Sequence, residues 1–296
     1  MFTSVANINV YLLRRLYLYG LLMKFKLSLT VVFSSVMAYL FCVDKINLLS
    51  TFCLAISGFC ITASANIFNQ IIERELDKLM TRTQNRPLPQ NHLTLMEAYL
   101  LAGILGVMGI GLLSVYFNML SGILGALALL SYAFIYTPMK QLSPISVFIG
   151  AIPGAMPLII GSVAATNAIT PKGLIFFAIQ FLWQLPHFWS IAWLLDSDYK
   201  QAGFRLLPTP DGEKSRSAAV QCIPYLLILV VVSSLPYMLG YAGVISLLVG
   251  VGFSLFYLMR GFDFVIHIDD AAAKKLMFTS FAYIPIVLLG YVLDKI

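Results

Sequence analysis

The chain has 296 residues, of which 60% are hydrophobic and 11% are charged, and its mean hydropathy is +0.89. Soluble domains carry about 25% charged residues, so a chain this apolar cannot cover a globular surface with polar groups. The composition therefore excludes a soluble enzyme, a disordered protein and a simple nucleic-acid binder. The net charge of +6 is expected to reflect membrane topology instead.

The segment before the first long apolar run has the composition of a helix that lies on a membrane. Val10–Met23 alternates apolar residues with Arg14 and Arg15, which is typical of an interfacial helix. Residues 1–26 are therefore predicted to form a cytoplasmic interfacial segment, followed by one polytopic domain at residues 27–296.

Nine apolar runs follow, each close to the length of about 20 residues that a helix needs to cross a bilayer. They lie at Leu27–Val43, Leu48–Ile72, Leu95–Tyr116, Met119–Tyr136, Pro144–Ala165, Leu174–Leu195, Ala218–Met238, Tyr241–Met259 and Leu276–Leu293. The runs leave no room for a separate soluble domain. The predicted fold class is an all-α integral membrane protein, a bundle of nine transmembrane helices.

The basic residues fix the predicted orientation of this bundle. With the N-terminus in the cytoplasm, 16 of the 19 Lys and Arg residues fall on the cytoplasmic side, as the positive-inside rule requires. The other side has only Lys45, Lys172 and Lys295. The C-terminus is then periplasmic. The N-terminal segment has too little serine for an organelle transit peptide, which favours a bacterial inner membrane.

The acidic residues gather on the same side as the basic ones. Only Asp44 and Asp294 fall on the other side, so 11 of the 13 acids share the cytoplasmic face. Long loops that are dense in both charges are where a functional site is built, and ionisable groups at a membrane edge are costly and usually functional. The alternative is that these loops are merely solvated.

A column of oxygen-bearing side chains ends the second apolar run. Asn69, Glu73 and Asp77 are spaced four residues apart, so on a helix they share one face. Carboxylate and amide oxygens suit Mg²⁺, which takes few protein ligands and shares the rest of its shell with phosphate and water. The bases that follow, which suit phosphate oxygens, are Arg74, Lys78, Arg82 and Arg86. A surface of i,i+4 ion pairs is the alternative, but Glu73 and Asp77 would then repel each other.

This segment resembles the UbiA-type intramembrane prenyltransferases, and within them the protohaem IX farnesyltransferase (haem O synthase) branch. The superfamily motif is Asn-x-x-x-Asp-x-x-x-Asp, and Glu73 stands at its middle position. Further matching segments cover most of the chain. They are Met80–Pro89, Tyr136–Lys140, Gly154–Gly161, Trp183–Trp189, Asp196–Pro208 and Ala273–Leu276. The chain departs from the family at Lys24-Phe25-Lys26 and Lys140-Gln141, and the superfamily's second acidic motif is not reproduced.

The resemblance implies roles for particular residues. Catalytic roles are expected for Asn69, Glu73, Asp77, Tyr136, Lys140, His187 and Asp198. Mg²⁺ would be the cofactor, with metal ligands Asn69, Glu73, Asp77 and Asp198. Diphosphate is expected to bind Arg74, Lys78, Arg82, Arg86, Lys140 and Lys200.

Several of these residues also have simpler explanations. For Asp198 and Lys200 the alternative is a helix end with a turn at Gly203. Tyr136 and Lys140 are alternatively anchors at the membrane interface. His187 lies at membrane depth between Trp183 and Trp189, where an unpartnered histidine is costly. Its expected roles are haem contact, axial iron ligation or proton transfer, and the alternative is a hydrogen bond to a neighbouring helix.

The resemblance implies transfer of a farnesyl group from farnesyl diphosphate to a vinyl group of protohaem IX (haem B), giving haem O. The expected partners are the lipid bilayer, haem B and farnesyl diphosphate, with a downstream haem A synthase or terminal oxidase assembly; no nucleic acid is expected. Two alternatives stay open. One is a prenyltransferase acting on another aromatic acceptor such as 4-hydroxybenzoate, and the other is a secondary transporter, although no inverted repeat is visible in the sequence.

Overall fold

The computed structural model describes residues 2–209 and 212–296, with side chains described from residue 12 onward. Within this part of the chain, nine helical segments are long and apolar enough to span a membrane. They are formed by α2 (Phe25–Cys42), α3 (Leu48–Ile72), α5 (Leu95–Leu112) with a π-helical turn, α6 (Met119–Leu130) with a π-helical turn and α7 (Thr137–Met139), α8 (Ser146–Thr166), α9 (Pro171–Leu194), α11 (Arg216–Val220) with α12 (Cys222–Met238), α13 (Val244–His267) and α14 (Asp270–Leu293). The prediction of a nine-helix bundle is confirmed.

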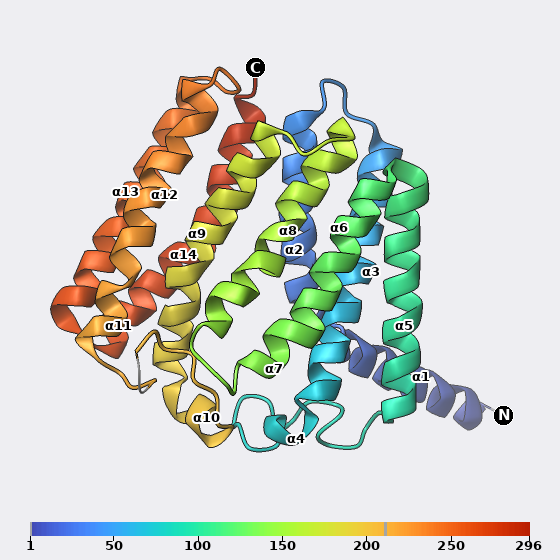
Figure 1. Ribbon diagram of the computed structural model, residues 1–296. Helices are drawn as coiled ribbons and strands as arrows, with labels where there is room; N and C mark the ends of the chain where they lie inside the picture. Colours follow the sequence, from blue (N-terminus) through green and yellow to red (C-terminus); the bar gives the residue numbers. More distant parts are fainter. Residues whose placement is uncertain (1, 210–211) are drawn as a thin grey trace.

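The spanning helices run side by side, and their long connections lie at one end of the bundle (Figure 1). This end carries the short helices α4 (Arg74–Asp77) and α10 (Asp196–Gln201) and is named the charged end below. The C-terminus lies at the opposite end (Figure 1). The assignment of the charged end to the cytoplasm, and of the C-terminus to the periplasm, stays a prediction.

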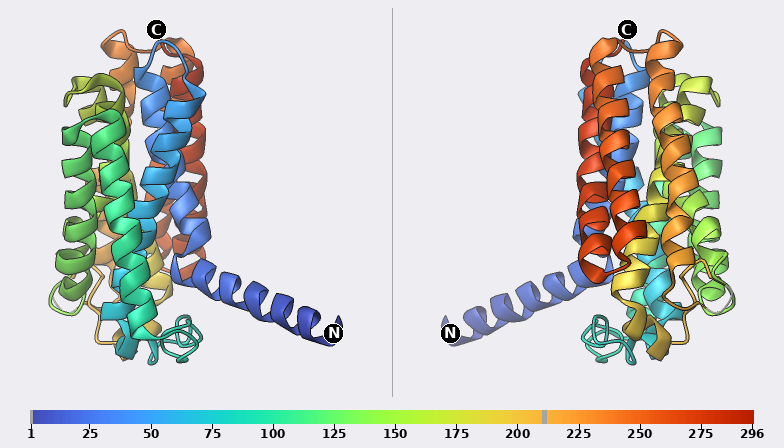
Figure 2. Two further views of the ribbon diagram at one scale, coloured as in Figure 1. Left: turned by 90° about the vertical axis from the view of Figure 1, so that its right-hand side faces the viewer. Right: turned by 90° about the vertical axis from the view of Figure 1, so that its left-hand side faces the viewer.

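Helix α1 (Phe2–Leu22) stands apart from the bundle. It leaves the charged end at a wide angle to the spanning helices (Figure 2). Its inner end is held by Leu18 and Leu22, which pack against Ile67 and other apolar residues of the same cluster. An interfacial position at residues 1–26 and a polytopic domain at residues 27–296 stay predictions.

Small residues let α2 and α8 approach each other closely. A Cβ atom built on Gly161 of α8 would overlap the backbone carbonyl of Ser35 in α2. Small residues at such contacts are typical of helix pairs in membranes, because close packing replaces the hydrophobic effect as the driving force. The contact fixes α8 against α2 in the centre of the bundle.

Gly161→Ala is expected to destabilise the protein by about 1–3 kcal/mol, because overpacking forces the backbones apart. The matched control is Gly103→Ala in α5, where nothing lies within 4 Å of the added Cβ. Thermal denaturation in detergent measures both variants. Equal stability of the two variants would contradict the proposed close contact.

The eighth connection differs from the sequence prediction. The sequence places Arg260, Lys274 and Lys275 in a loop, but α13 continues to His267 and α14 begins at Asp270. These three basic residues are therefore helical. The Asp269 side chain accepts a hydrogen bond from Ala272 N at 2.7 Å, an N-cap that starts α14 ahead of the apolar run. Hydropathy alone cannot find such polar helix extensions.

Candidate active site at the charged end

The predicted column of oxygen-bearing side chains is present and buried. Asn69 lies in the last turn of α3, Glu73 is the residue between α3 and α4, and Asp77 ends α4. The backbone stays helical across this junction, because Glu73 N donates to Asn69 O at 2.9 Å and Asp77 N donates to Glu73 O at 2.8 Å. The three residues are only 1%, 4% and 0% exposed. Their burial points to a site and not to a solvated ion-pair surface.

Each member of the column is held by a cation from elsewhere in the chain. Lys24 Nζ, just before α2, donates to Asn69 Oδ1 at 2.9 Å. Lys140 Nζ, just after α7, lies 2.7 Å from Glu73 Oε1. Arg86 Nη1 donates to both carboxylate oxygens of Asp77, at 2.8 and 2.7 Å. These contacts are named the ion-paired column below.

The charges of the ion-paired column shift one another's proton affinity. Loss of hydration lowers the pKa of Lys24 to about 7, and the nearby cations of Arg86 and Lys140 add to this effect. Burial raises the pKa of Asp77 against the opposing effect of Arg86. Burial acts to lower the pKa of Lys140, but the Glu73 carboxylate, together with Tyr132 and Tyr199, raises it overall. The site is thus crowded with groups that respond to an added anion or cation.

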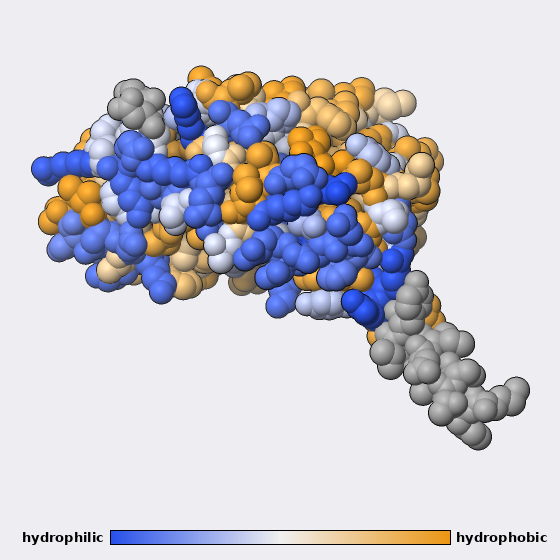
Figure 3. All heavy atoms as spheres, turned by 90° about the horizontal axis from the view of Figure 1, so that it is seen from below, coloured by the Kyte–Doolittle hydropathy of each residue, from blue (hydrophilic) through white to orange (hydrophobic). Residues whose placement is uncertain are grey.

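The loop that follows α4 is joined to helix α10 at the charged end. Asp198 Oδ2 accepts a hydrogen bond from Arg82 N at 3.1 Å, and Arg82 Nη2 donates to the Tyr199 hydroxyl at 3.2 Å. The Arg82 guanidinium also lies 5.5 Å from the centre of the Tyr199 ring. Hydrophilic side chains gather over this face when it is viewed from below (Figure 3). Asp198 therefore positions the loop that carries Arg82.

Tyr136 and Lys140 form the wall of the site at the end of the fourth span. Lys140 Nζ lies 4.8 Å from the centre of the Tyr136 ring, a cation–π distance. The Tyr136 ring in turn lies against α8 at Gly150, where an added Cβ would be 2.5 Å from the ring atom Cε2. Lys140 thus contacts both an aromatic face and the Glu73 carboxylate.

Three predicted diphosphate ligands lie away from the ion-paired column. Arg74 and Lys78 turn to the exposed Glu75, at 3.3 and 2.6 Å. Lys200 pairs with Asp196 at 3.0 Å and with Glu213 at 2.5 Å. Of the predicted bases, Arg86 and Lys140 therefore pair with the buried acids, and Arg82 contacts Asp198 and Tyr199.

His187 lies in α9, away from the ion-paired column. Its Nδ1 atom is 2.7 Å from the Ser280 hydroxyl of α14, and that hydroxyl donates to the Met277 carbonyl. The Ser280 hydroxyl thus lies between His187 Nδ1 and the Met277 carbonyl. The imidazole stacks on the Trp183 indole, with ring centres 4.9 Å apart and an interplanar angle of 14°. The hydrogen bond to a neighbouring helix is thus present.

Lys24 and Thr137 both contact Asn69 of the column but were absent from the sequence prediction. Thr137 accepts a hydrogen bond from Asn69 Nδ2 at 3.2 Å, which fixes the amide so that Oδ1 faces Lys24. The sequence signal that could have identified Lys24 is its position directly before the first span, in the segment where the chain departs from the family pattern. Its partner lies 45 residues further along the chain, and no local pattern could identify that partner.

The donor set of the column fits a hard divalent cation. It consists of one amide and two carboxylate groups, which carry oxygen ligands of the kind that Mg²⁺ prefers. In the described residues, no three His, Cys, Asp or Glu side chains come together as a complete metal cage. A few protein ligands at a polar rim are nevertheless what a Mg²⁺–diphosphate complex needs, since phosphate and water supply the remaining ligands.

A family model described as the UbiA prenyltransferase family matches residues 28–283. The chain belongs to this family. Membership of a prenyltransferase family makes the chain an enzyme that transfers prenyl groups, and it excludes a secondary transporter. The matched residues include all nine spanning segments in whole or in large part.

Curated relatives within the UbiA prenyltransferase family are similar over nearly the full chain. The protoheme IX farnesyltransferase of Cytophaga hutchinsonii is 45% identical over 282 residues, which are 94% of this chain and 97% of the relative. That of Christiangramia forsetii is 41% identical over 280 residues, 92% of this chain and 91% of the relative. These relatives place the chain in the protohaem IX farnesyltransferase branch, as the sequence motifs predicted.

Solved structures with low sequence identity support the fold. A digeranylgeranylglyceryl phosphate synthase aligns with a TM-score of 0.80 at 21% identity and covers 95% of this chain and 98% of its own. A UbiA homologue from Archaeoglobus fulgidus, bound to DMAPP and Mg²⁺, aligns with a TM-score of 0.67 at 14% identity and covers 90% and 99%. At these identities the likeness concerns the fold alone.

Proposed function

We propose that this UbiA prenyltransferase carries a farnesyl group from farnesyl diphosphate to a vinyl group of protohaem IX and so produces haem O. The observation that carries the proposal is the ion-paired column. Buried carboxylates, each matched to a cation at one end of an apolar bundle, suit a metal–diphosphate headgroup whose tail lies in the bundle. Two relatives that carry this activity in their names, 45% and 41% identical, extend over nearly the whole chain.

The column residues Asn69, Glu73 and Asp77 are the proposed Mg²⁺ ligands, and Asp198 is the proposed additional ligand. Bound Mg²⁺ would neutralise the negative charge that accumulates on the leaving diphosphate. Ligation requires the carboxylates to exchange their present partners, so Lys140 and Arg86 would be released toward the diphosphate oxygens. The same cations then serve the acids in the free enzyme and the phosphates in the complex.

The transfer step follows from this arrangement. The bond between the farnesyl C1 and the diphosphate oxygen breaks, and its electron pair leaves with the diphosphate. The haem vinyl group supplies the electron pair for the new carbon–carbon bond, water adds to the resulting cation, and a proton is lost. Arg82, Arg86 and Lys140 stabilise the diphosphate charge as it develops. Tyr136, beside Lys140, is the proposed aromatic face for the allylic cation.

His187 is the proposed contact to the haem acceptor. It lies in an aromatic region of α9 and α14 and not among the charged side chains, which suits the apolar macrocycle better than diphosphate. The surrounding bundle keeps water from quenching the allylic cation. Arg74, Lys78 and Lys200 stay proposed diphosphate ligands that would have to leave their surface carboxylates.

The proposed location is a bacterial inner membrane, supported by the bacterial relatives and by the nine apolar helices of the described residues. The proposed product, haem O, would pass to a downstream haem A synthase or to terminal oxidase assembly. Both substrates are amphiphiles with anionic ends, so each could enter from the lipid and leave its charge at the rim.

The acceptor is tested by competition. Purified enzyme is incubated with farnesyl diphosphate, Mg²⁺ and equal amounts of haem B and 4-hydroxybenzoate, and both products are measured by mass spectrometry. The expected result is farnesylated haem with no farnesylated benzoate above the enzyme-free control. Preferential farnesylation of 4-hydroxybenzoate would overturn the proposed acceptor while leaving prenyl transfer intact.

A further inference from the structure

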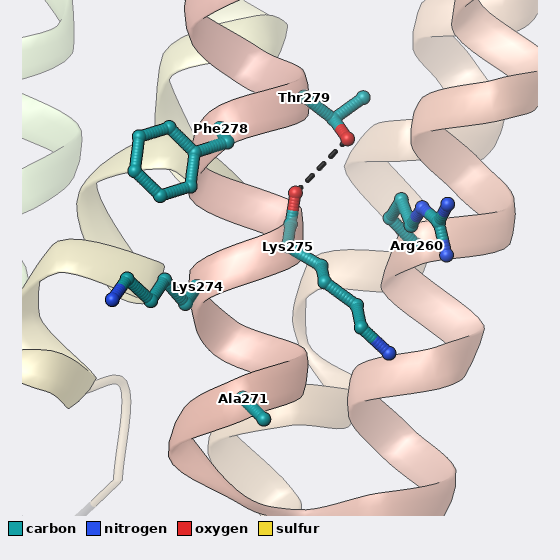
Figure 4. A pocket seen from close by; sticks show the side chains of 6 residues that line it. All are labelled: Arg260, Ala271, Lys274, Lys275, Phe278 and Thr279. Atoms are coloured by element: carbon teal, nitrogen blue, oxygen red, sulfur yellow. Dashed lines mark hydrogen bonds between the residues drawn. The ribbon is translucent and has the colours of Figure 1, made fainter.

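A shallow pocket on α13 and α14 lies outside the ion-paired column. It has a volume of about 390 Å³ and is lined by Arg260, Ala271, Lys274, Lys275, Phe278 and Thr279. Figure 4 shows that Lys274 and Phe278 point to one side of α14, whereas Lys275 and Arg260 lie on the other. The two lysines are neighbours in sequence but face different surroundings.

The two sides of this pocket differ in charge compensation. Asp263 lies 3.6 Å from Lys275 Nζ and 3.9 Å from Arg260 Nη1, so these cations share a carboxylate. Lys274 has no ion pair with any residue that the structure describes. It is exposed, one turn into α14. An uncompensated ammonium group at the edge of an apolar bundle is suited to an incoming anion.

An aromatic strip leads from Lys274 to His187. Phe278 and Phe281 follow Lys274 along one face of α14, at spacings of four and three residues. Their ring centres are 6.2 Å apart, and the Phe281 ring centre is 5.1 Å from that of His187. The His187 ring, which Phe281 contacts at this end of the strip, also stacks on the Trp183 indole. Lys274 and Phe281 are separated by about 10 Å along the helix axis.

The described residues leave the outer face of the strip uncovered. Phe278 and Phe281 are 56% and 50% exposed, although both are large and apolar. Its far end is rigid, because Trp183 Nε1 donates to the Ser280 carbonyl at 2.9 Å and His187 bonds the Ser280 hydroxyl. A flat apolar ring that ends in carboxylates would place the ring along the strip and a carboxylate at Lys274. The propionate-bearing macrocycle of haem has this form.

We propose that Lys274, Phe278 and Phe281 of α14, together with His187 and Trp183 of α9, form the acceptor subsite, with Lys274 binding a haem propionate. The proposal rests on the proposed function, because it takes haem as the acceptor. It assigns the acceptor's charged end to a position separate from the cations of the ion-paired column. The two substrates then keep their anionic ends on different basic side chains.

Haem binding without farnesyl diphosphate tests the subsite independently of turnover. The haem B dissociation constant is measured by Soret absorbance titration for wild type, Lys274→Gln and the matched control Lys275→Gln. Loss of a charged hydrogen bond is expected to weaken binding roughly tenfold in Lys274→Gln. Lys275→Gln is expected to stay within about twofold of wild type. An equal effect of both substitutions, or none for Lys274→Gln, would overturn the proposal.

Esterified haem identifies which group Lys274 binds. Haem B dimethyl ester, which lacks propionate charges, is expected to bind wild type as weakly as haem B binds Lys274→Gln, and Lys274→Gln is expected to cause no further loss. A full further loss with the ester would show that Lys274 does not bind a propionate. An effect of Lys274→Gln that appears only in vesicles containing anionic phospholipid would assign Lys274 to a lipid headgroup and overturn the proposal.

Turnover separates this proposal from the proposed function. If wild type makes haem O and the KM for haem B is unchanged in Lys274→Gln, the subsite alone is wrong. If wild type binds haem B through Lys274 but makes no haem O, the proposed function fails and the subsite stands. The KM for farnesyl diphosphate is expected to be unchanged in Lys274→Gln, since its diphosphate is proposed to bind the other basic cluster.

Discussion

Asp77→Asn is expected to lower farnesyl transfer by roughly a thousandfold, a loss comparable to removal of one charge-stabilising group from an active site. The side chain keeps its shape, but it loses the negative charge that is proposed to hold Mg²⁺ at the leaving diphosphate. Asp77 is fully buried in the ion-paired column, so water cannot replace the charge that the substitution removes. The measurement is the initial rate of diphosphate release with haem B as acceptor.

The matched control for Asp77→Asn is Glu75→Gln on the same short helix. Glu75 has a side chain that is 69% exposed and pairs with Lys78 on the opposite side from the column. Its activity is expected to stay within about twofold of wild type, since exposed ion pairs contribute little. Asp77→Asn with rates like those of Glu75→Gln would remove Asp77 from the proposed metal site.

Arg86→Met is expected to destabilise the ligand-free protein by about 3 kcal/mol, because it leaves the buried Asp77 carboxylate without its cation. The Asp77 side chain is 0% exposed and that of Arg86 is 23% exposed, so solvent replaces little of the lost interaction. Unfolding in detergent titrations measures the free-energy difference. Lys78→Met, which removes an exposed cation from Glu75, is the control and is expected to change stability by less than about 1 kcal/mol.

The double variant Arg86→Met/Asp77→Asn separates the charge effect from lost packing. Without the buried charge, the penalty for removing Arg86 is expected to shrink to about 1 kcal/mol. A double variant that is as unstable as Arg86→Met plus Asp77→Asn taken independently would indicate that the two side chains do not interact. That outcome would contradict the ion-paired column at Asp77.

The spanning helices and the column could be predicted because both depend on local sequence. Hydropathy over about 20 residues identifies a spanning helix irrespective of its neighbours, and the i,i+4 spacing of Asn69, Glu73 and Asp77 needs only one helix. The structure confirms nine spanning segments in the described residues and a shared helical face for the column. Neither feature depends on a tertiary contact, so the sequence alone was enough to predict both.

The partners of the column could not be predicted, because they come from distant parts of the chain. Lys24 and Lys140 meet Asn69 and Glu73 across separations of 45 and 67 residues. Arg74 and Lys78 lie beside the column in sequence but turn to Glu75. On a helix, adjacent residues point in different directions, so residues next to the column in sequence have other partners, and their role as diphosphate ligands stays a prediction.

Hydropathy also could not predict where α13 ends and where α14 begins. Lys274 and Lys275 are polar, so an apolar window ends before them, yet the Asp269 N-cap starts α14 earlier. That extension is what places Lys274, Phe278 and Phe281 on one helical face. The proposed acceptor subsite depends on this difference between the predicted loop and the observed helix.

The most direct test of the central claim is the Mg²⁺ dependence of haem O formation. Purified enzyme is incubated with haem B and farnesyl diphosphate in excess Mg²⁺ or in excess EDTA, and the haems are quantified by mass spectrometry. Haem O that accumulates with Mg²⁺ and is absent with EDTA is the predicted result. Equal amounts of haem O in both samples would contradict a metal–diphosphate site at Asn69, Glu73 and Asp77.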